Sequence, residues 1–141
     1  MLQRIQTIWL FLAAACVLIS LKISFFAGNI ISPADQTIKS YLEVNGMYNL
    51  TNNILTITVA VMAIISVFLY SNRKLQMRLI YAAMVCELAL MFSYESIIRK
   101  FTEGNYSVGS LLQLVVMIFF VLAHRGIRKD NKIIEESNRL R

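Results

Sequence analysis

Residues 54–92 read ILTITVAVMAIISVFLY SNRKLQMR LIYAAMVCELALMF, which is two apolar runs on either side of a short basic turn. A bilayer core of about 30 Å needs about 20 apolar residues in a helix that rises about 1.5 Å per residue. Each run, with its flanking residues, is long enough to cross a membrane. Because the turn at 72–78 is short, it predicts two antiparallel helices that lie side by side.

The rest of the chain has the same character. Of its 141 residues, 57% are hydrophobic and only 16% are charged, whereas about a quarter of the residues of a soluble domain are charged. Four segments qualify as membrane spans: about 5–27, 50–71, 79–98 and 108–124. The sequence therefore predicts an all-α integral membrane protein, a single domain over 1–141 that forms an antiparallel four-helix bundle.

Lys and Arg residues are concentrated on one side of this predicted bundle, which sets its orientation. Ten of the 14 Lys and Arg residues fall on the side of both termini. These ten are Arg4, Arg73, Lys74, Arg78, Arg125, Arg128, Lys129, Lys132, Arg139 and Arg141, and the other four are Lys22, Lys39, Arg99 and Lys100. Both termini are thus expected in the cytoplasm, and the net charge of +6 indicates topology and headgroup contact, not nucleic-acid binding.

The first outer loop, about 28–49, allows two local structures. Ser32-Pro33-Ala34-Asp35 is typical of a helix start and predicts a short helix after it, with Ile38, Tyr41 and Leu42 on one face. Asn45-Gly46, flanked by 41–44 and 47–49, is instead typical of a β-hairpin turn. In either form, the loop is a hypothetical contact surface for another protein.

The tail at 125–141 is predicted to continue the fourth span as a cytoplasmic helix. Ile127, Ile134 and Leu140 recur at near-heptad spacing and give this helix one narrow apolar face. Two interpretations stay open. The helix lies along the inner leaflet with its basic residues near anionic lipid, or it docks on a cytoplasmic partner.

The third span carries two carboxylates. Glu87 lies nine residues beyond Arg78, about 14 Å along the helix and so near the midplane. A charge there costs about 2.5–3.5 kcal/mol on insertion scales, so the neutral form is the cheaper one at that depth. Gln113 on the fourth span is the expected partner. The two residues form either an interhelical polar clamp or a proton or substrate site.

Lys22 and Glu95 are expected at similar heights near the outer interface. They follow Arg4 and Arg78 by 18 and 17 residues, respectively, on two spans that both run outward. They could form an ion pair between the first and third spans. Alternatively, each side chain extends separately to the outer headgroups.

The chain shows no spacing typical of a catalytic, cofactor or metal site, so no cofactor and no metal are predicted. Cys16 and Cys86 lie inside apolar runs without a C-x-x-C motif and are interpreted as packing residues. His124 stands alone at the inner end of the fourth span. An enzyme is therefore the least favoured class of function.

Three segments together resemble one family. They are MLQRIQT at 1–7, NRKLQMR at 72–78, and the basic C-terminal segment from RGIRKD at 125–130 to NRLR at 138–141. They are similar to an uncharacterised membrane family of Bacteroidota, domain of unknown function 4293. The resemblance covers nearly the whole chain, apart from the first outer loop. It implies a four-helix protein of the bacterial inner membrane and implies no activity.

Two functional hypotheses follow. The leading one is an accessory or scaffolding subunit of an envelope complex, which meets a membrane-protein partner through the outer loop and the tail. A homo-oligomer in the lipid bilayer is the other possible assembly. The alternative is a small oligomeric proton- or ion-coupled transporter in which Glu87 is the coupling group.

Overall fold

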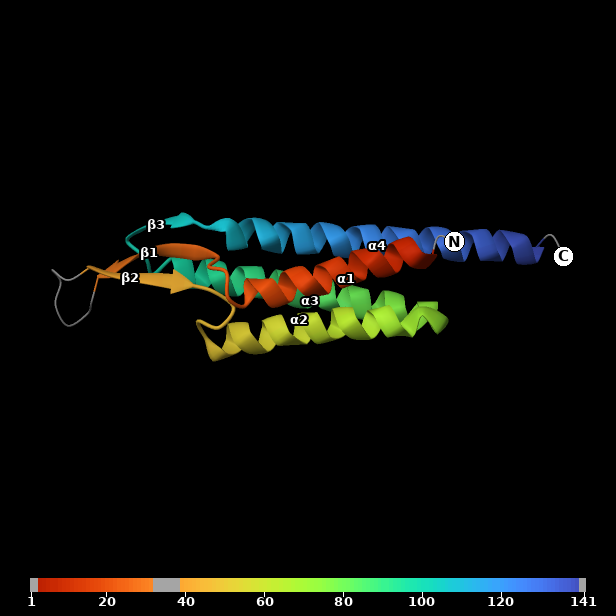
Figure 1. Cartoon of the computed structure of the whole chain (residues 1–141), viewed down its shortest axis with the longest axis horizontal. Helices are drawn as coiled ribbons and strands as arrows, with labels where there is room; N and C mark the ends of the chain where they lie inside the picture. Colours follow the sequence, from red (N-terminus) through yellow and green to blue (C-terminus); the bar gives the residue numbers. More distant parts are fainter. Residues whose placement is uncertain (1–2, 32–38, 140–141) are drawn as a thin grey trace.

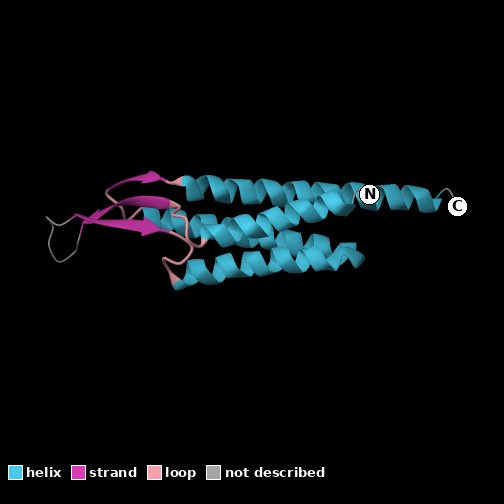
Figure 2. Cartoon of the chain, in the orientation of Figure 1, coloured by secondary structure: helices cyan, strands magenta, loops and turns pink. Residues whose placement is uncertain are grey.

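The computed structural model describes residues 3–31 and 39–139. The elements are α1 (Gln3–Ser20), β1 (Phe26–Ile31), β2 (Lys39–Val44), α2 (Leu50–Phe68), the 3-10 helix η1 (Leu69–Ser71), α3 (Arg73–Ile98), β3 (Glu103–Tyr106) and α4 (Val108–Arg139). The four α-helices lie side by side and the strands gather beyond one end of them, which we call the sheet end (Figures 1 and 2). At the opposite end, α1 begins and α4 extends past its neighbours.

Three helical segments are long and apolar enough to span a membrane: Leu50–Ser71, Arg73–Ile98 and Val108–Ile133. The fourth helix, α1, is apolar but shorter. The predicted first span, 5–27, is too long at its outer end, because the helix stops at Ser20 and the chain enters β1 at Phe26. The helix α3 starts at Arg73, six residues before the predicted third span of 79–98.

The short connection between α2 and α3 makes these helices antiparallel neighbours, as the sequence predicts. Asn72 ends the turn, and its side-chain oxygen accepts a hydrogen bond of 3.3 Å from the Leu75 backbone N–H. This bond satisfies one of the free donors at the start of α3. The predicted helical tail is also present, since α4 continues without a break to Arg139.

The helices approach one another closely because small residues line their contacts. The contacts run from α4 to α1, from α1 to α2 and from α2 to α3, and α3 meets α4 least extensively. The core contains five alanines that are at most 2% exposed: Ala13, Ala60, Ala63, Ala83 and Ala123. The seam between α3 and α4 is thus the loosest of the four.

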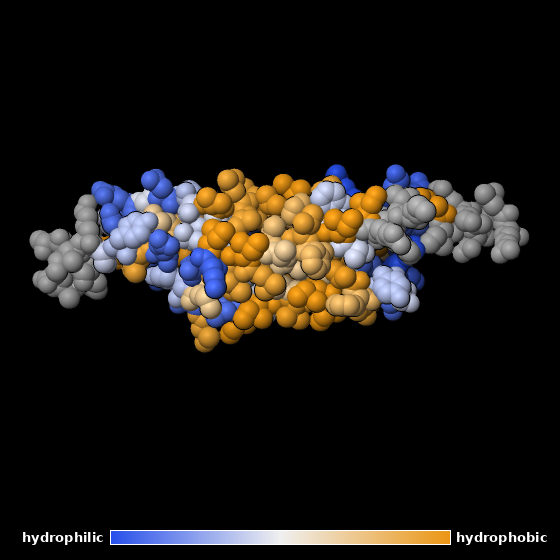
Figure 3. All heavy atoms as spheres, in the orientation of Figure 1, coloured by the Kyte–Doolittle hydropathy of each residue, from blue (hydrophilic) through white to orange (hydrophobic). Residues whose placement is uncertain are grey.

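The outer surface of the bundle is apolar. Phe11, Phe68 and Phe92 are 67%, 73% and 72% exposed, respectively. Figure 3 shows an apolar band across the middle of the visible face, with hydrophilic residues toward its ends. Apolar surface of this extent marks an interaction site, and together with the candidate spans it implies contact with a lipid bilayer.

The sheet is a correction to the all-α prediction. Its strand order is β2-β1-β3, and both pairings are antiparallel. The predicted hairpin at Asn45-Gly46 is wrong, because β2 pairs with β1 and the chain after Asn45 turns toward α2. The alternative short helix is wrong at Tyr41 and Leu42, which lie in β2, whereas its predicted start at 32–35 lies outside the described residues.

Aromatic contacts attach the sheet to the end of α3. The Phe25 ring stacks on Tyr94 with 4.4 Å between centroids, and Phe26 meets the rings of Phe101 and Tyr106 edge-on. Gly28 is needed where β1 crosses β3, because a Cβ there would collide with the Glu103 carbonyl. The apolar residues after α1 therefore cover the end of the bundle and do not lengthen the first helix.

Candidate functional site

Five of the polar residues that are buried inside the described bundle form one group, and we call them the polar cluster. They are Asn52 and Thr56 on α2, Glu87 and Tyr94 on α3, and Gln113 on α4. Each is at most 1% exposed. Three helices therefore contribute polar groups to a region from which both lipid and bulk water are excluded.

Tyr94 is the centre of this cluster. Its phenol lies beside the Thr56 hydroxyl and the Gln113 amide, with the Glu87 carboxyl nearby. Thr56 donates a 2.7 Å hydrogen bond to the Asn52 backbone carbonyl. Ser93 donates one of 2.5 Å to the Asn52 side-chain oxygen. These contacts connect α2 with α3 and bring Gln113 of α4 next to them.

Much of the hydrogen-bonding capacity of the cluster is nevertheless unused. Six buried side-chain atoms in the described part of the chain lack a partner, and five of them belong to this cluster. They are Asn52 Nδ2, both carboxyl oxygens of Glu87, and the amide nitrogen and oxygen of Gln113. Buried polar groups are nearly always paired, so this concentration marks the cluster as a candidate site.

The structure brings the predicted residues Glu87 and Gln113 into the same cluster, and both are near Tyr94. Among the described residues, no hydrogen bond joins the two side chains. Their role as a clamp or as a proton site stays a prediction. The arrangement offers one carboxyl group that can bind or release a proton. Two amides and a phenol beside it can form hydrogen bonds with a small polar guest.

Lys22 and Glu95 have different neighbours. Lys22 follows the end of α1 and lines a small apolar groove with Ile19 and Met47. Glu95 accepts a 3.1 Å hydrogen bond from the Tyr106 hydroxyl of β3, which raises the pKa of that phenol above its ordinary value. Within the described ranges no ion pair joins Lys22 to Glu95, and the pair stays a prediction.

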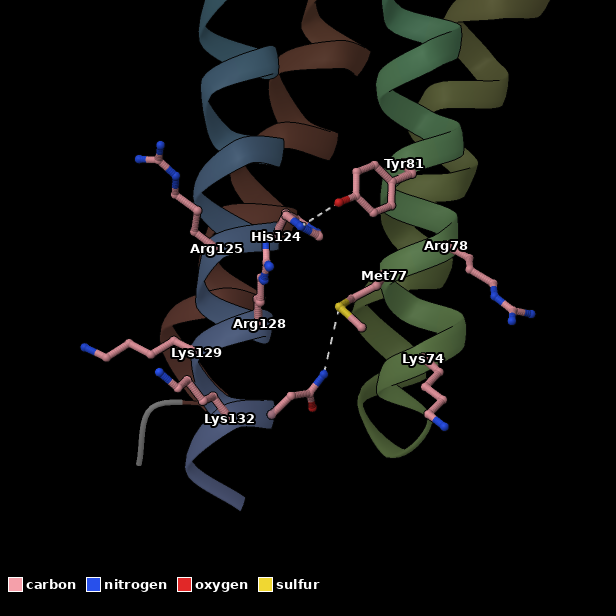
Figure 4. Close-up of a pocket in the computed structure, with 10 residues that line it drawn as sticks. Lys74, Met77, Arg78, Tyr81, His124, Arg125, Arg128, Lys129 and Lys132 are labelled. Carbon is pink, nitrogen blue, oxygen red and sulfur yellow. Dashed lines mark hydrogen bonds between the residues drawn. The ribbon is translucent and has the colours of Figure 1, made fainter. Parts of the chain in front are cut away.

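A second candidate site lies at the other end, along the loose seam between α3 and α4. This basic groove has a volume of about 920 Å³. It is lined by Lys74, Met77, Arg78, Tyr81, His124, Arg125, Arg128, Lys129, Asn131 and Lys132. Figure 4 shows Tyr81 and His124 pointing toward each other across the seam, with Arg78 and Arg125 extending outward on either side.

Sequence reasoning counted these cations as topology signals and missed the groove. A signal was present, because Lys74, Arg78 and Tyr81 are spaced by four and then three residues. His124, Arg128 and Asn131 repeat the same spacing on α4. Residues at this spacing share one helix face. What the spacing could not show is that the two faces meet.

The described residues hold no group of three or more His, Cys, Asp or Glu side chains that could bind a metal ion. Cys16 and Cys86 are free thiols, each partly buried in a helix. His124 is not isolated, since its Nε2 lies 2.9 Å from the Tyr81 hydroxyl.

These features define a small, mostly helical protein with candidate membrane spans and a three-stranded antiparallel cap. The chain belongs to the family called domain of unknown function DUF4293, whose model matches residues 2–140. No curated protein and no solved structure matches it.

Proposed function

We propose that the chain is a four-span protein of the bacterial inner membrane and that the end opposite the sheet faces the cytoplasm. The uneven distribution of Lys and Arg supports this orientation. The 18 residues of α1 correspond to about 27 Å of helix. The hydrocarbon core is about 30 Å thick, and local thinning of the bilayer can absorb a difference of this size.

Within that membrane, we infer that the protein is an accessory subunit of an envelope complex and that the sheet is its contact surface. The observation that supports this role is that the sheet has two unpaired edges in the described structure. Within the described ranges, β2 and β3 each pair only with the central strand β1. An unpaired strand edge presents backbone donors and acceptors that a strand of another protein can use.

The edge of β2 is the better candidate of the two. It has six residues, whereas β3 has four. Tyr41 on β2 is 65% exposed and Leu42 is 39% exposed. An added strand would therefore find both backbone partners and apolar side chains on β2.

Site-specific photocrosslinking in the native host tests this proposal. A photoreactive phenylalanine analogue replaces Tyr41 in one variant and Tyr70 in the other. The native tyrosines are 65% and 66% exposed, respectively, but lie at opposite ends of the molecule. We expect a reproducible adduct with one other protein at position 41 and none with that protein at position 70. Adducts with a second copy only, or identical patterns at the two positions, would contradict an accessory role through the sheet.

A second function, proton- or ion-coupled transport, is favoured by one observation. Both carboxyl oxygens of Glu87 are buried without a partner, so a proton or a small cation could bind there. None of the three surface grooves described for this structure is lined by Glu87. Transport would therefore need a conformation in which the bundle opens, and for this reason we place it second.

Proteoliposomes with an internal pH indicator distinguish the two functions. A potassium diffusion potential drives protons inward, and the wild type is compared with Glu87→Gln. Glu95→Gln is the matched control, because it removes the other carboxylate of α3 at an exposed position. A proton flux that Glu87→Gln abolishes and Glu95→Gln preserves would support transport, and equal fluxes in all three would exclude Glu87 as the coupling group.

A further inference from the structure

We propose that the basic groove between α3 and α4 binds the phosphate group of an anionic phospholipid. The inference rests on the membrane placement given above but does not depend on the accessory role or on Glu87.

The cations at this end are gathered in one place. The structure describes the side chains of seven Lys and Arg residues there, and six of them line the groove. The six are Lys74, Arg78, Arg125, Arg128, Lys129 and Lys132. Cations that served only to fix topology would have no reason to share one seam, so the clustering indicates an anionic occupant.

None of the described residues that line the groove is acidic. The nearby carboxylate of Asp130 is directed to the other side of α4, where it accepts a hydrogen bond from Gln6 of α1. Positive charge is therefore concentrated along the rim of the seam, where Arg78 and Arg125 extend outward and Arg128 lies beside the His124 ring (Figure 4). Lys and Arg side chains form their strongest hydrogen bonds with carboxylate and phosphate oxygens.

The floor of the groove is polar and ordered. The Tyr81 hydroxyl and His124 Nε2 are 2.9 Å apart, and Arg128 lies next to the His124 ring. Asn131 on the same wall contacts the Met77 sulfur of the opposite helix. These contacts hold the two walls in register around the space that a phosphate would enter.

The apolar surface beyond the groove favours a lipid over a free phosphate. On α3, Val85 and Leu88 follow Tyr81 on the same helix face and are 65% and 46% exposed. On α4, Ile118 precedes Arg125 by two turns and is 55% exposed. A lipid headgroup in the groove could thus lay its acyl chains along both helices, whereas a soluble phosphate would gain nothing from this surface.

Native mass spectrometry of the full chain in mild detergent tests the proposal. Phosphatidylglycerol is titrated against phosphatidylcholine, which carries no net charge. The groove variant Lys74→Gln/Arg128→Gln removes one cation from each wall, and the control Arg99→Gln/Lys100→Gln removes two exposed cations at the sheet end. We expect phosphatidylglycerol to bind the groove variant about tenfold more weakly than it binds the wild type, and to bind the control unchanged.

A charge-conserving variant controls for the possibility that the groove variant loses binding because it misfolds. Lys74→Arg/Arg128→Lys keeps both charges and should keep phosphatidylglycerol binding within a factor of about two. Equal losses in the groove and control variants would overturn the proposal, as would equal binding of the two lipids. If millimolar inorganic phosphate displaced the bound phosphatidylglycerol, the ligand of the groove would be free phosphate and not a lipid, which would also overturn the proposal.

Discussion

Gln6 on α1 donates a hydrogen bond to the Asp130 carboxylate on α4, although 124 residues separate them. Both side chains are only 8% exposed. Gly126 makes room for the contact, because a Cβ at that position would lie 2.8 Å from Gln6 Cγ. This bond closes the bundle between its first and last helices, at the end opposite the sheet.

Removing the carboxylate should destabilise that end of the bundle. We expect Asp130→Ala to lower the free energy of unfolding by about 1.5–3 kcal/mol, because the buried Gln6 amide then loses a hydrogen bond to a charged group. The thermal midpoint of the purified protein in detergent reports the change. Lys129→Ala is the control, since its exposed side chain precedes Asp130 in the same helical turn. Equal midpoints for the two variants would show that the bond contributes nothing.

The register of the sheet can be checked by paired cysteines in a Cys16→Ala/Cys86→Ala background. Ala27 lies directly opposite Glu43 in the antiparallel pair of β1 and β2. We expect Ala27→Cys/Glu43→Cys to form a disulfide on mild oxidation, which is measured as a mobility shift on a non-reducing gel.

The control for this register is Ala27→Cys/Leu42→Cys. A shift of one residue places the second cysteine on the opposite face of the sheet, so this pair should crosslink far less. The hairpin that the sequence favours at Asn45-Gly46 would instead bring residues 43 and 48 together. Efficient crosslinking of Glu43→Cys/Tyr48→Cys would therefore contradict the structure.

The helices could be predicted because their cause is local. A mostly apolar run without charges, such as 54–70, needs no distant partner to become a helix in a membrane. The turn at 72–78 also predicts that α2 and α3 lie side by side and antiparallel, since a connection this short allows only that arrangement.

The sheet and the groove could not be predicted in the same way, because both depend on distant residues. Phe26 pairs with Val44 and also with Tyr106, which is 80 positions away. The residues next to Phe26 in the sequence are apolar and resemble the end of a membrane span. Likewise, Tyr81 meets His124 only because α3 and α4 lie side by side. Glu87 could be singled out from its depth alone, but its lack of a partner is visible only when three helices are assembled.

The contact between Tyr106 and Glu95 predicts a dependence on high pH. The hydrogen bond to Glu95 raises the pKa of the Tyr106 phenol above its ordinary 10.0. The folded state thus holds this proton more tightly than the unfolded state. The stabilisation is complete below the ordinary value and is lost as the pH rises through the folded pKa.

Ultraviolet titration of tyrosinate measures this effect, with Tyr106→Phe identifying the signal of residue 106. We expect Glu95→Gln to move that signal to lower pH, toward the ordinary value, because the carboxylate acceptor is gone. Glu43→Gln is the control, since it removes another carboxylate at the sheet end that has no contact with Tyr106 in the described structure. An unchanged titration in Glu95→Gln would show that the contact does not persist in solution.

Replacing a buried residue usually destabilises a protein, but we expect a different result in the polar cluster because several of its hydrogen-bonding groups have no partner in the described structure. Replacing a buried polar group that lacks a partner with an apolar group of similar shape is nearly neutral or stabilising. We therefore expect Glu87→Met to leave the thermal midpoint unchanged or to raise it.

Glu87→Ala should instead lower the free energy of unfolding by about 2–4 kcal/mol, because it leaves a cavity in the bundle. The comparison of the two variants separates the carboxyl group from the volume of the side chain. If Glu87→Met lost as much stability as Glu87→Ala, the carboxyl would have a partner such as a buried water, and the cluster would be a structural clamp. If Glu87→Met were as stable as the wild type, the carboxyl would contribute nothing to folding. Its presence in the core would then require a functional reason, and the proton-flux comparison of Glu87→Gln with Glu95→Gln would decide what that reason is.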